Sequence, residues 1–178
     1  GTAPSGWVHI ARKLPDGSQV ELDSTAKEGQ LILRAGRSTF TLATLPVEEF
    51  PVLSDGEDGH RFTVTTRELR SLIDRTRFAI STEETRYYLN GIYLHPTEED
   101  GTSVLRAVAT DGHRLARVDI PLPAGAAGMS GVIVPRKTVG EVRKLLDDAT
   151  DDVEITVSDT KIHFSTGAIE LTSKLIDG

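Results

Sequence analysis

Asp111 and His113 are the residues whose types and spacing most resemble catalytic machinery. A carboxylate two positions from an imidazole could move protons in a hydrolase, because alternate residues of a strand point the same way. The surrounding stretch, 109–123, sets further charged residues between apolar ones: Arg114, Arg117 and Asp119. However, the sequence has no Gly-x-Ser-x-Gly elbow, no second histidine at metal-ligand spacing and no glycine-rich phosphate cradle before a helix. A small cytosolic hydrolase is therefore an alternative hypothesis, and it requires a third group within hydrogen-bond reach of the pair.

The segment Thr110-Asp-Gly-His113 also has the composition of a tight turn. In such a turn Asp111 would cap its own backbone, Gly112 would take a positive φ, and His113 would form local hydrogen bonds. This interpretation explains the turn itself. It does not explain the Arg114-Leu-Ala-Arg117 sequence that follows.

Composition limits the classes of protein to consider. A chain of 178 residues with 38% hydrophobic content can bury one ordinary core and part of another, so we expect one complete domain and a fragment. The absence of cysteine excludes disulfides and thiolate metal sites, and five scattered histidines predict neither a metal site nor a cofactor. We find no apolar run of about twenty residues and no signal-peptide layout, which predicts a cytoplasmic protein that does not interact with a membrane.

The charge distribution matters more than the net charge of −7. Binding to nucleic acid without sequence preference needs Lys and Arg near phosphates, and an evenly spread negative charge would oppose it. Acidic residues gather where turns and element ends are expected: Glu48/Glu49, Asp55–Asp58, Glu83/Glu84, Glu98–Asp100 and Asp147–Asp152. The basic residues lie elsewhere.

Two helices are predicted. Thr65 and Glu68 have the spacing of a capping box, and an apolar face follows in a helix from Thr65 to Phe78: Leu69, Leu72, Ile73 and Thr76. The segment 132–135 leads into a second helix, about Lys137 to Leu146, whose face contains Val139, Val142, Leu145 and Leu146.

The remaining pattern predicts strands. A hairpin is expected over 30–34 and 38–42, and strands over 86–94, 103–109, 114–120, 153–157, 161–165 and 168–173. The predicted class is α+β, an antiparallel sheet with two helices packed on one face, preceded by part of a similar domain.

An internal repeat supports that last feature. Arg12-Lys-Leu14 and Arg143-Lys-Leu145 lie 131 residues apart, and each precedes a turn, a strand and a hairpin. This distance is suited to duplication of a whole domain, so residues 1–51 would be the tail of one domain and 60–178 a complete copy. Chance similarity of two hairpins is the alternative.

The basic residues fall opposite the apolar faces of the two helices. Arg67 also lies on this side, and we predict that the helices pack side by side and turn five cations to solvent: Arg70, Arg75, Arg77, Lys137 and Lys144. Asp74, Glu141 and Asp148 share these surfaces, so an ordinary mixed-charge surface is the alternative.

Four segments resemble, in order, motifs of the second domain of the bacterial DNA polymerase III beta subunit, the sliding clamp: Arg86–Gly91, Ala107–Ala116, Val132–Lys137 and Thr172–Gly178. The hairpin Leu31–Leu45 with Pro46–Pro51 resembles the end of that family's first domain. Residues 1–10 do not match convincingly.

The resemblance implies a DNA-clamp fold and a noncatalytic processivity factor of the replicative polymerase. Two full-length chains of three similar domains would form a ring with helices around duplex DNA, bound without sequence preference. The residues expected to face DNA are Arg70, Arg75, Arg77, Tyr87, Tyr88, Arg136, Lys137 and Lys144. A core position for one of the adjacent tyrosines is the alternative. The loop 81–85 is acidic where many relatives carry an amide facing DNA.

The resemblance also implies a pocket for short linear peptides of polymerases, the clamp loader and repair proteins. The matching residues are Leu89, Thr110, Gly112, His113, Arg114 and Leu115. Leu89, Leu115 and the Arg114 stem would supply apolar walls. The family continues into a third domain that provides the other wall, so we expect this chain to form an incomplete pocket and no closed ring.

Overall fold

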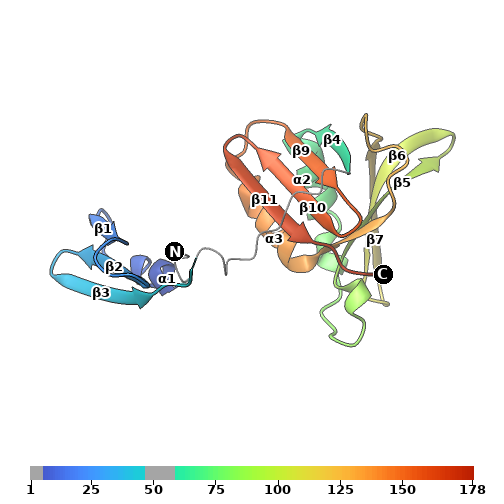
Figure 1. Ribbon diagram of the computed structural model, residues 1–178. Helices are drawn as coiled ribbons and strands as arrows, with labels where there is room; N and C mark the ends of the chain where they lie inside the picture. The colour runs from blue at the N-terminus through green and yellow to red at the C-terminus, as the bar shows by residue number, and fades with distance from the viewer. Residues whose placement is uncertain (1–5, 47–58) are drawn as a thin grey trace. The chain divides into compact units, whose positions relative to one another are not determined.

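The computed structural model describes residues 6–46 and 59–178, and the chain divides into two compact units, Gly1–Ser54 and Asp55–Gly178. Figure 1 shows the elements of both. The first unit contains a short helix and one antiparallel sheet of order β1-β2-β3: α1 (Gly6–Ala11), β1 (Val20–Asp23), β2 (Gln30–Ala35) and β3 (Ser38–Ala43). Leu31, Leu33 and Ala35 are buried on one side of β2, which confirms the half-buried hairpin predicted here.

The second unit contains two antiparallel sheets of four strands, in the orders β11-β10-β9-β4 and β7-β6-β5-β8. Its strands are β4 (His60–Val64), β5 (Gly91–Glu99), β6 (Thr102–Thr110), β7 (Leu115–Pro121), β8 (Val132–Pro135), β9 (Val153–Val157), β10 (Lys161–Thr166) and β11 (Ile169–Lys174). The antiparallel α+β class is confirmed, with the strands shared between two sheets. Most predicted strand ends agree within one residue, but β4 and β8 were not predicted as strands.

Two helices complete the second unit, α2 (Thr66–Asp74) and α3 (Arg136–Leu145), and they contact each other as predicted. Figure 1 shows them together behind the sheet that contains β9, β10 and β11. Their apolar faces join the core formed by both sheets, in which the most deeply buried large side chains are Leu105, Leu146, Ile155 and Ile162. Burial between helices and sheets therefore fixes which helix face points outward.

The predicted capping box of α2 is present. Thr65 accepts a hydrogen bond from the Glu68 backbone, and the Glu68 carboxylate accepts from the Thr65 backbone. The predicted end at Phe78 is wrong, because the α-helix stops at Asp74 and a 3-10 turn, η2, covers Arg77–Ala79. Thr76 explains the change, since its side chain is fully buried and its hydroxyl donates to the Leu72 carbonyl at 2.5 Å.

The strand predicted over 86–94 is also wrong in its first half. Tyr87–Leu89 forms a 3-10 turn, η3, and β5 begins only at Gly91. The Ser81 backbone donates to the Leu89 carbonyl at 3.1 Å, and the Asn90 side chain donates to the Glu83 carbonyl at 3.1 Å. These contacts fold residues 81–90 into a closed loop, which overrides the β propensity of the two tyrosines.

The internal repeat is visible in the order of elements. Helix α1 precedes β1-β2-β3 just as α3 precedes β9-β10-β11, and both sets of three strands are antiparallel meanders. Gly36 and Gly167 occupy the two hairpin turns with the same φ of 57°, and they lie 131 residues apart, as Arg12 and Arg143 do. Both turns use glycine because this backbone conformation disfavours other residues.

Candidate functional site

The turn that joins β6 to β7 is held by its own polar groups. The Thr110 hydroxyl donates to the Arg114 carbonyl at 2.7 Å and accepts from the Gly112 backbone at 3.1 Å. One Asp111 carboxylate oxygen accepts from the backbone N–H groups of His113 and Arg114, both at 3.0 Å. Gly112 has a φ of 89°, so the sequence correctly predicted a tight turn with Asp111 as its cap.

The same geometry opposes a catalytic role for Asp111. Hydrogen bonds from the His113 and Arg114 backbones hold the pKa of its carboxyl below the ordinary value, which makes it a weak base. Its second carboxylate oxygen accepts from the Arg114 side chain at 3.1 Å. Among the described residues, the His113 ring has no hydrogen bond to Asp111, and no group of three or more His, Cys, Asp or Glu side chains could hold a metal. The turn interpretation therefore accounts for these residues better than the hydrolase hypothesis does.

Apolar side chains are exposed around this turn. Leu115 is 64% exposed, and the Arg114 guanidinium lies over the Phe78 ring, 5.6 Å from its centroid. Phe78 is itself 56% exposed and was assigned only to a helix end by the sequence analysis. Leu89, in η3, is half-buried. Exposed apolar groups beside a rigid turn are suited to hold the apolar side chains of a ligand.

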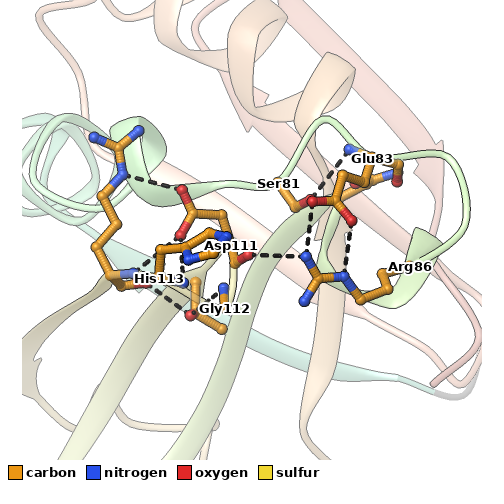
Figure 2. Close-up of polar contacts among 9 residues, drawn as sticks. Ser81, Glu83, Arg86, Asp111, Gly112 and His113 are labelled. Atoms are coloured by element: carbon orange, nitrogen blue, oxygen red, sulfur yellow. Dashed lines mark hydrogen bonds and ion pairs between the residues drawn. The ribbon is translucent and has the colours of Figure 1, made fainter.

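One contact joins the loop 81–90 to this turn, and Figure 2 shows it. The Arg86 guanidinium donates to both carboxylate oxygens of Glu83, at 2.9 and 2.8 Å, and to the Asp111 carbonyl at 3.2 Å. The sequence analysis did not identify Arg86 or Glu83 as site residues. Their partners could not be read from the pattern, because Arg86 and Asp111 lie on separate segments 25 residues apart.

Most of the cations predicted on the helices are exposed. This group contains Arg75, Arg77, Arg136, Lys137 and Lys144. Two of them have acidic neighbours on the same surface, since Arg77 lies 3.7 Å from Asp74 and Lys144 lies 3.0 Å from Glu141. Such exposed pairs are weak and leave the cations available to other anions.

The prediction that Arg70 turns to solvent is wrong. Arg70 is half-buried, and its guanidinium donates to the Leu146 carbonyl at the end of α3. A cation at this position satisfies a carbonyl left free by the helix end and interacts favourably with the helix dipole. Arg143 makes a second link between the helices, at 2.7 Å from Asp74 and 2.5 Å from Asp147. These two arginines therefore hold the helices together.

Tyr87 and Tyr88 are both exposed, at 56% and 47%. Their rings meet edge to face, with centroids 5.8 Å apart. Neither occupies the core position that a strand would have given to one of them, because residues 87–89 form a 3-10 turn. Both rings are therefore available on the surface of the loop.

Comparison with known protein families finds two adjoining matches. Residues 58–178 match the model of the DNA polymerase III beta subunit, central domain, and residues 3–54 match that of the DNA polymerase III beta subunit, N-terminal domain. The chain is 54% identical over 178 residues to the beta sliding clamp of Caulobacter vibrioides, which covers 99% of the chain and 48% of the relative. It is 37% identical over 172 residues to the beta sliding clamp of Escherichia coli, covering 97% and 45%.

Solved structures give the same result. The Caulobacter crescentus beta sliding clamp, with polyethylene glycol bound at its suggested beta-motif tethering region, matches with a TM-score of 0.88 and 54% identity over 99% of this chain and 47% of that one. The Bartonella birtlesii sliding clamp bound to griselimycin matches with a TM-score of 0.87 and 50% identity over 99% and 47%. The chain thus spans about half the length of the relatives it matches.

Proposed function

This chain belongs to the family of DNA polymerase III beta subunits, and we propose that it serves as part of a sliding clamp that encircles duplex DNA and holds the replicative polymerase on it. Residues 1–51 would form the C-terminal part of the first clamp domain, and residues 60–178 the central domain. The complete protein would form a homodimeric ring without catalytic activity of its own. In that ring, the polymerase, clamp loader and repair proteins would dock through short peptides.

The observation that carries the proposal is a pair of packed helices whose outward surface exposes cations. Arg75, Arg136 and Lys137 reach solvent although the chain as a whole carries a charge of −7. Cations can neutralise phosphates without reading bases, which suits a protein that slides on any sequence. We therefore assign DNA contact to Arg75, Arg77, Tyr87, Tyr88, Arg136, Lys137 and Lys144, and a helix-joining role to Arg70.

The turn Thr110–Leu115, with Leu89, is the proposed peptide site. Its backbone is fixed by internal hydrogen bonds, and Leu115 and the Arg114 stem offer apolar surface. A Bartonella birtlesii relative 50% identical to this chain has been solved with griselimycin bound. That complex supports the binding of peptide ligands by the family and supplies a probe for this chain.

DNA titrations test the first part of the proposal. A mixed-sequence duplex should bind weakly, and the affinity should fall steeply with salt, with a log–log slope of about 0.9 for each phosphate neutralised. Replacing both Arg75 and Lys137 by alanine should reduce that slope by up to about two, because each cation lost removes at most one phosphate contact.

The matched control is Arg61→Ala. Arg61 is 69% exposed but lies on the side of β4 opposite the buried Phe62, away from the helices. We expect this variant to retain the parental slope. Binding that distinguishes sequences, or that persists unchanged at high salt, would contradict a sliding contact.

The hydrolase alternative has its own test. Asp111→Asn retains a side-chain oxygen that can cap the turn but removes the charge that proton transfer needs. We expect no hydrolytic activity, either in the parent chain or in the variant, towards ester, peptide or phosphate substrates. An activity that is present in the parent and lost in Asp111→Asn would contradict the noncatalytic proposal.

A further inference from the structure

The β6–β7 turn has a fixed internal shape, but its orientation depends on outside support. Among the described residues, the side-chain hydrogen bonds of Thr110 and Asp111 stay within residues 110–114. Beyond strand pairing, two contacts seen among the described residues connect the turn to other segments. The Arg114 guanidinium lies over the Phe78 ring, and the Asp111 carbonyl accepts a hydrogen bond from Arg86. Because that carbonyl belongs to the peptide unit that leads into Gly112, the hydrogen bond from Arg86 fixes the plane of this unit.

Arg86 is aimed at the turn by Glu83. The fork of the guanidinium donates Nε and Nη2 to the two carboxylate oxygens, and Nη2 also reaches the Asp111 carbonyl. Because the guanidinium is planar, its two bonds to Glu83 also fix the direction of its bond to the Asp111 carbonyl. A lysine ammonium could not reproduce this fixed geometry. The pKa of Glu83 agrees with this geometry, because hydrogen bonds from Arg86 lower it below its ordinary value. Glu83 thus positions Arg86 without touching the turn.

Gly112 shows how closely Arg86 approaches. A Cβ atom added at Gly112 would lie 2.6 Å from Arg86 Nη1, closer than real contacts allow. The guanidinium therefore lies against the bare backbone of the turn, beside the residues proposed to hold a peptide. A side chain at this position would push the Arg86 guanidinium away, and the φ of 89° independently favours glycine.

The loop that carries Arg86 is itself anchored. Ser81 is buried and its hydroxyl accepts from the Glu83 backbone at 3.1 Å, while Asn90 donates to the Glu83 carbonyl. The Arg136 backbone donates to the Asn90 carbonyl at 2.9 Å, which ties the loop to the start of α3. A continuous set of hydrogen bonds thus runs from α3 through the loop to the turn.

We propose that Arg86, aimed by Glu83, is a positioning residue of the peptide site: it holds the Thr110–Leu115 turn in its binding orientation through the Asp111 carbonyl. The inference rests on the proposed function, because it assigns Arg86 a role in that same site. It also makes the loop with Tyr87 and Tyr88 part of the support of the peptide site, so a ligand that displaces the loop displaces the turn.

NMR spectroscopy of this chain tests the positioning without any ligand. In Glu83→Gln the amide signals of Gly112 and His113 should shift, although the Glu83 side chain bonds only to Arg86 among the described residues. The control Arg61→Gln removes an exposed ion pair with Glu154 on the outer side of β4 and should leave both signals in place. Unchanged Gly112 and His113 signals in Glu83→Gln would overturn the proposal.

Griselimycin titrations test the consequence for binding. Arg86→Gln should bind about five- to tenfold more weakly than the parent, which lies within the range expected for the net contribution of one hydrogen bond. Arg86→Lys should recover part of the loss, because an ammonium can serve one acceptor at a time. The double variant Glu83→Gln/Arg86→Gln should bind no more weakly than Arg86→Gln alone, since Glu83 acts through Arg86.

Two outcomes separate this inference from the proposed function. If the parent binds griselimycin and Arg86→Gln binds it equally well at unchanged thermal stability, the positioning role is wrong and the peptide site stands. If the parent does not bind griselimycin, the peptide site proposed for this chain fails. In that case the Gly112 and His113 signals in Glu83→Gln alone decide whether Arg86 positions the turn.

Discussion

Gly112 meets two requirements that differ in kind. Its φ of 89° lies in the left-handed region, and the Arg86 guanidinium occupies the space where a side chain would begin. Gly101, in the turn between β5 and β6, has a similar φ of 77° but nothing within 4 Å of an added Cβ. Substitutions at the two glycines therefore distinguish the effect of backbone strain from the effect of displacing Arg86.

We predict that Gly112→Ala and Gly101→Ala each destabilise the second unit by about 1–2 kcal/mol, the cost of a non-glycine residue in this region. Only Gly112→Ala should also weaken griselimycin binding, because it pushes Arg86 away from the Asp111 carbonyl. Urea unfolding measures the first effect and titration the second. Equal loss of binding in both variants would show that strain alone is responsible.

For single residues, the sequence predicted those features that depend on hydrogen bonds between residues close together in the chain. The Thr110–His113 turn could be predicted because Asp111 bonds to the backbone two and three residues ahead. The role of Arg86 could not be predicted, because it depends on the Asp111 carbonyl, an acceptor 25 residues away that the fold brings close. The same reason explains Arg70, whose acceptor, the Leu146 carbonyl, is 76 residues away.

Among the elements, α2 shows most clearly how a local pattern fixes a boundary. Its first turn is capped reciprocally by Thr65 and Glu68, whereas α3 follows Pro135 and has no side-chain cap. We predict that Thr65→Ala lowers the free energy of unfolding by about 1 kcal/mol and that Thr65→Ser retains most of it. Urea unfolding monitored by circular dichroism is the measurement, and an unchanged midpoint for Thr65→Ala would contradict the prediction.

The end of α2 and the start of β5 were less predictable for a common reason. Thr76 lies on the apolar face of α2, yet its hydroxyl bonds back to Leu72 and the helix ends before Phe78. The Tyr87–Leu89 segment has the composition of a strand, but contacts of Ser81 and Asn90 fold it into a loop. In both places hydrogen bonds between residues four to eight positions apart outweighed the propensity of the segment for a continuous helix or strand.

The outer side of the β5–β6–β7 sheet contains a cross-strand charge network. Arg106 on β6 donates to Asp119 on β7 at 2.8 Å and also to Glu99 on β5. Hydrogen bonds from Arg106 are the largest cause of the lowered pKa values of both acids. A folded-state pKa below the unfolded one means that the network stabilises the fold at neutral pH and loses this effect as the acids are protonated.

We therefore predict that Arg106→Gln lowers the melting temperature at pH 7. The difference in melting temperature from the parent should shrink as the pH falls below about 4 and through the lowered pKa values of Asp119 and Glu99 in the folded state. Arg61→Gln is the control, because the Arg61–Glu154 pair is exposed and 3.7 Å apart. Melting curves between pH 2 and 7 measure the effect. A difference for Arg106→Gln that stays constant over this range would show that packing of the arginine, and not its charge, stabilises the sheet.

For the molecule as a whole, the exposed cations on the helices are the groups through which an acidic chain could make the DNA contact proposed above. Exposed cations lie on α2, α3 and η2, some of them beside acids as in Arg77–Asp74 and Lys144–Glu141. The outer sheet surfaces carry mixed pairs such as Arg61–Glu154 and Arg117–Glu99. The repeated helix and three-stranded meander in both units fits the resemblance to a clamp built from similar domains. In the part of the chain that the structure describes, no helix is long and apolar enough to cross a membrane.

The last prediction concerns the length of chain needed to bind a peptide. The turn and Leu89 offer one apolar wall, and we expect a second wall from the half of the full-length relatives that this chain does not span. If about 100 Å² of apolar contact is missing, the loss is roughly 2.5 kcal/mol, or nearly two orders of magnitude in affinity. We expect griselimycin to bind this chain weakly for that reason.

The Caulobacter vibrioides beta sliding clamp provides a matched comparison, since this chain aligns with 48% of it at 54% identity. The relative at full length should bind griselimycin nearly a hundredfold more tightly than the same relative trimmed to its matching segment. The trimmed relative and this chain should have similar affinities, because both would present the same single wall. If trimming leaves the affinity of the relative unchanged, the turn and Leu89 make a complete site, and the missing wall contributes nothing to binding.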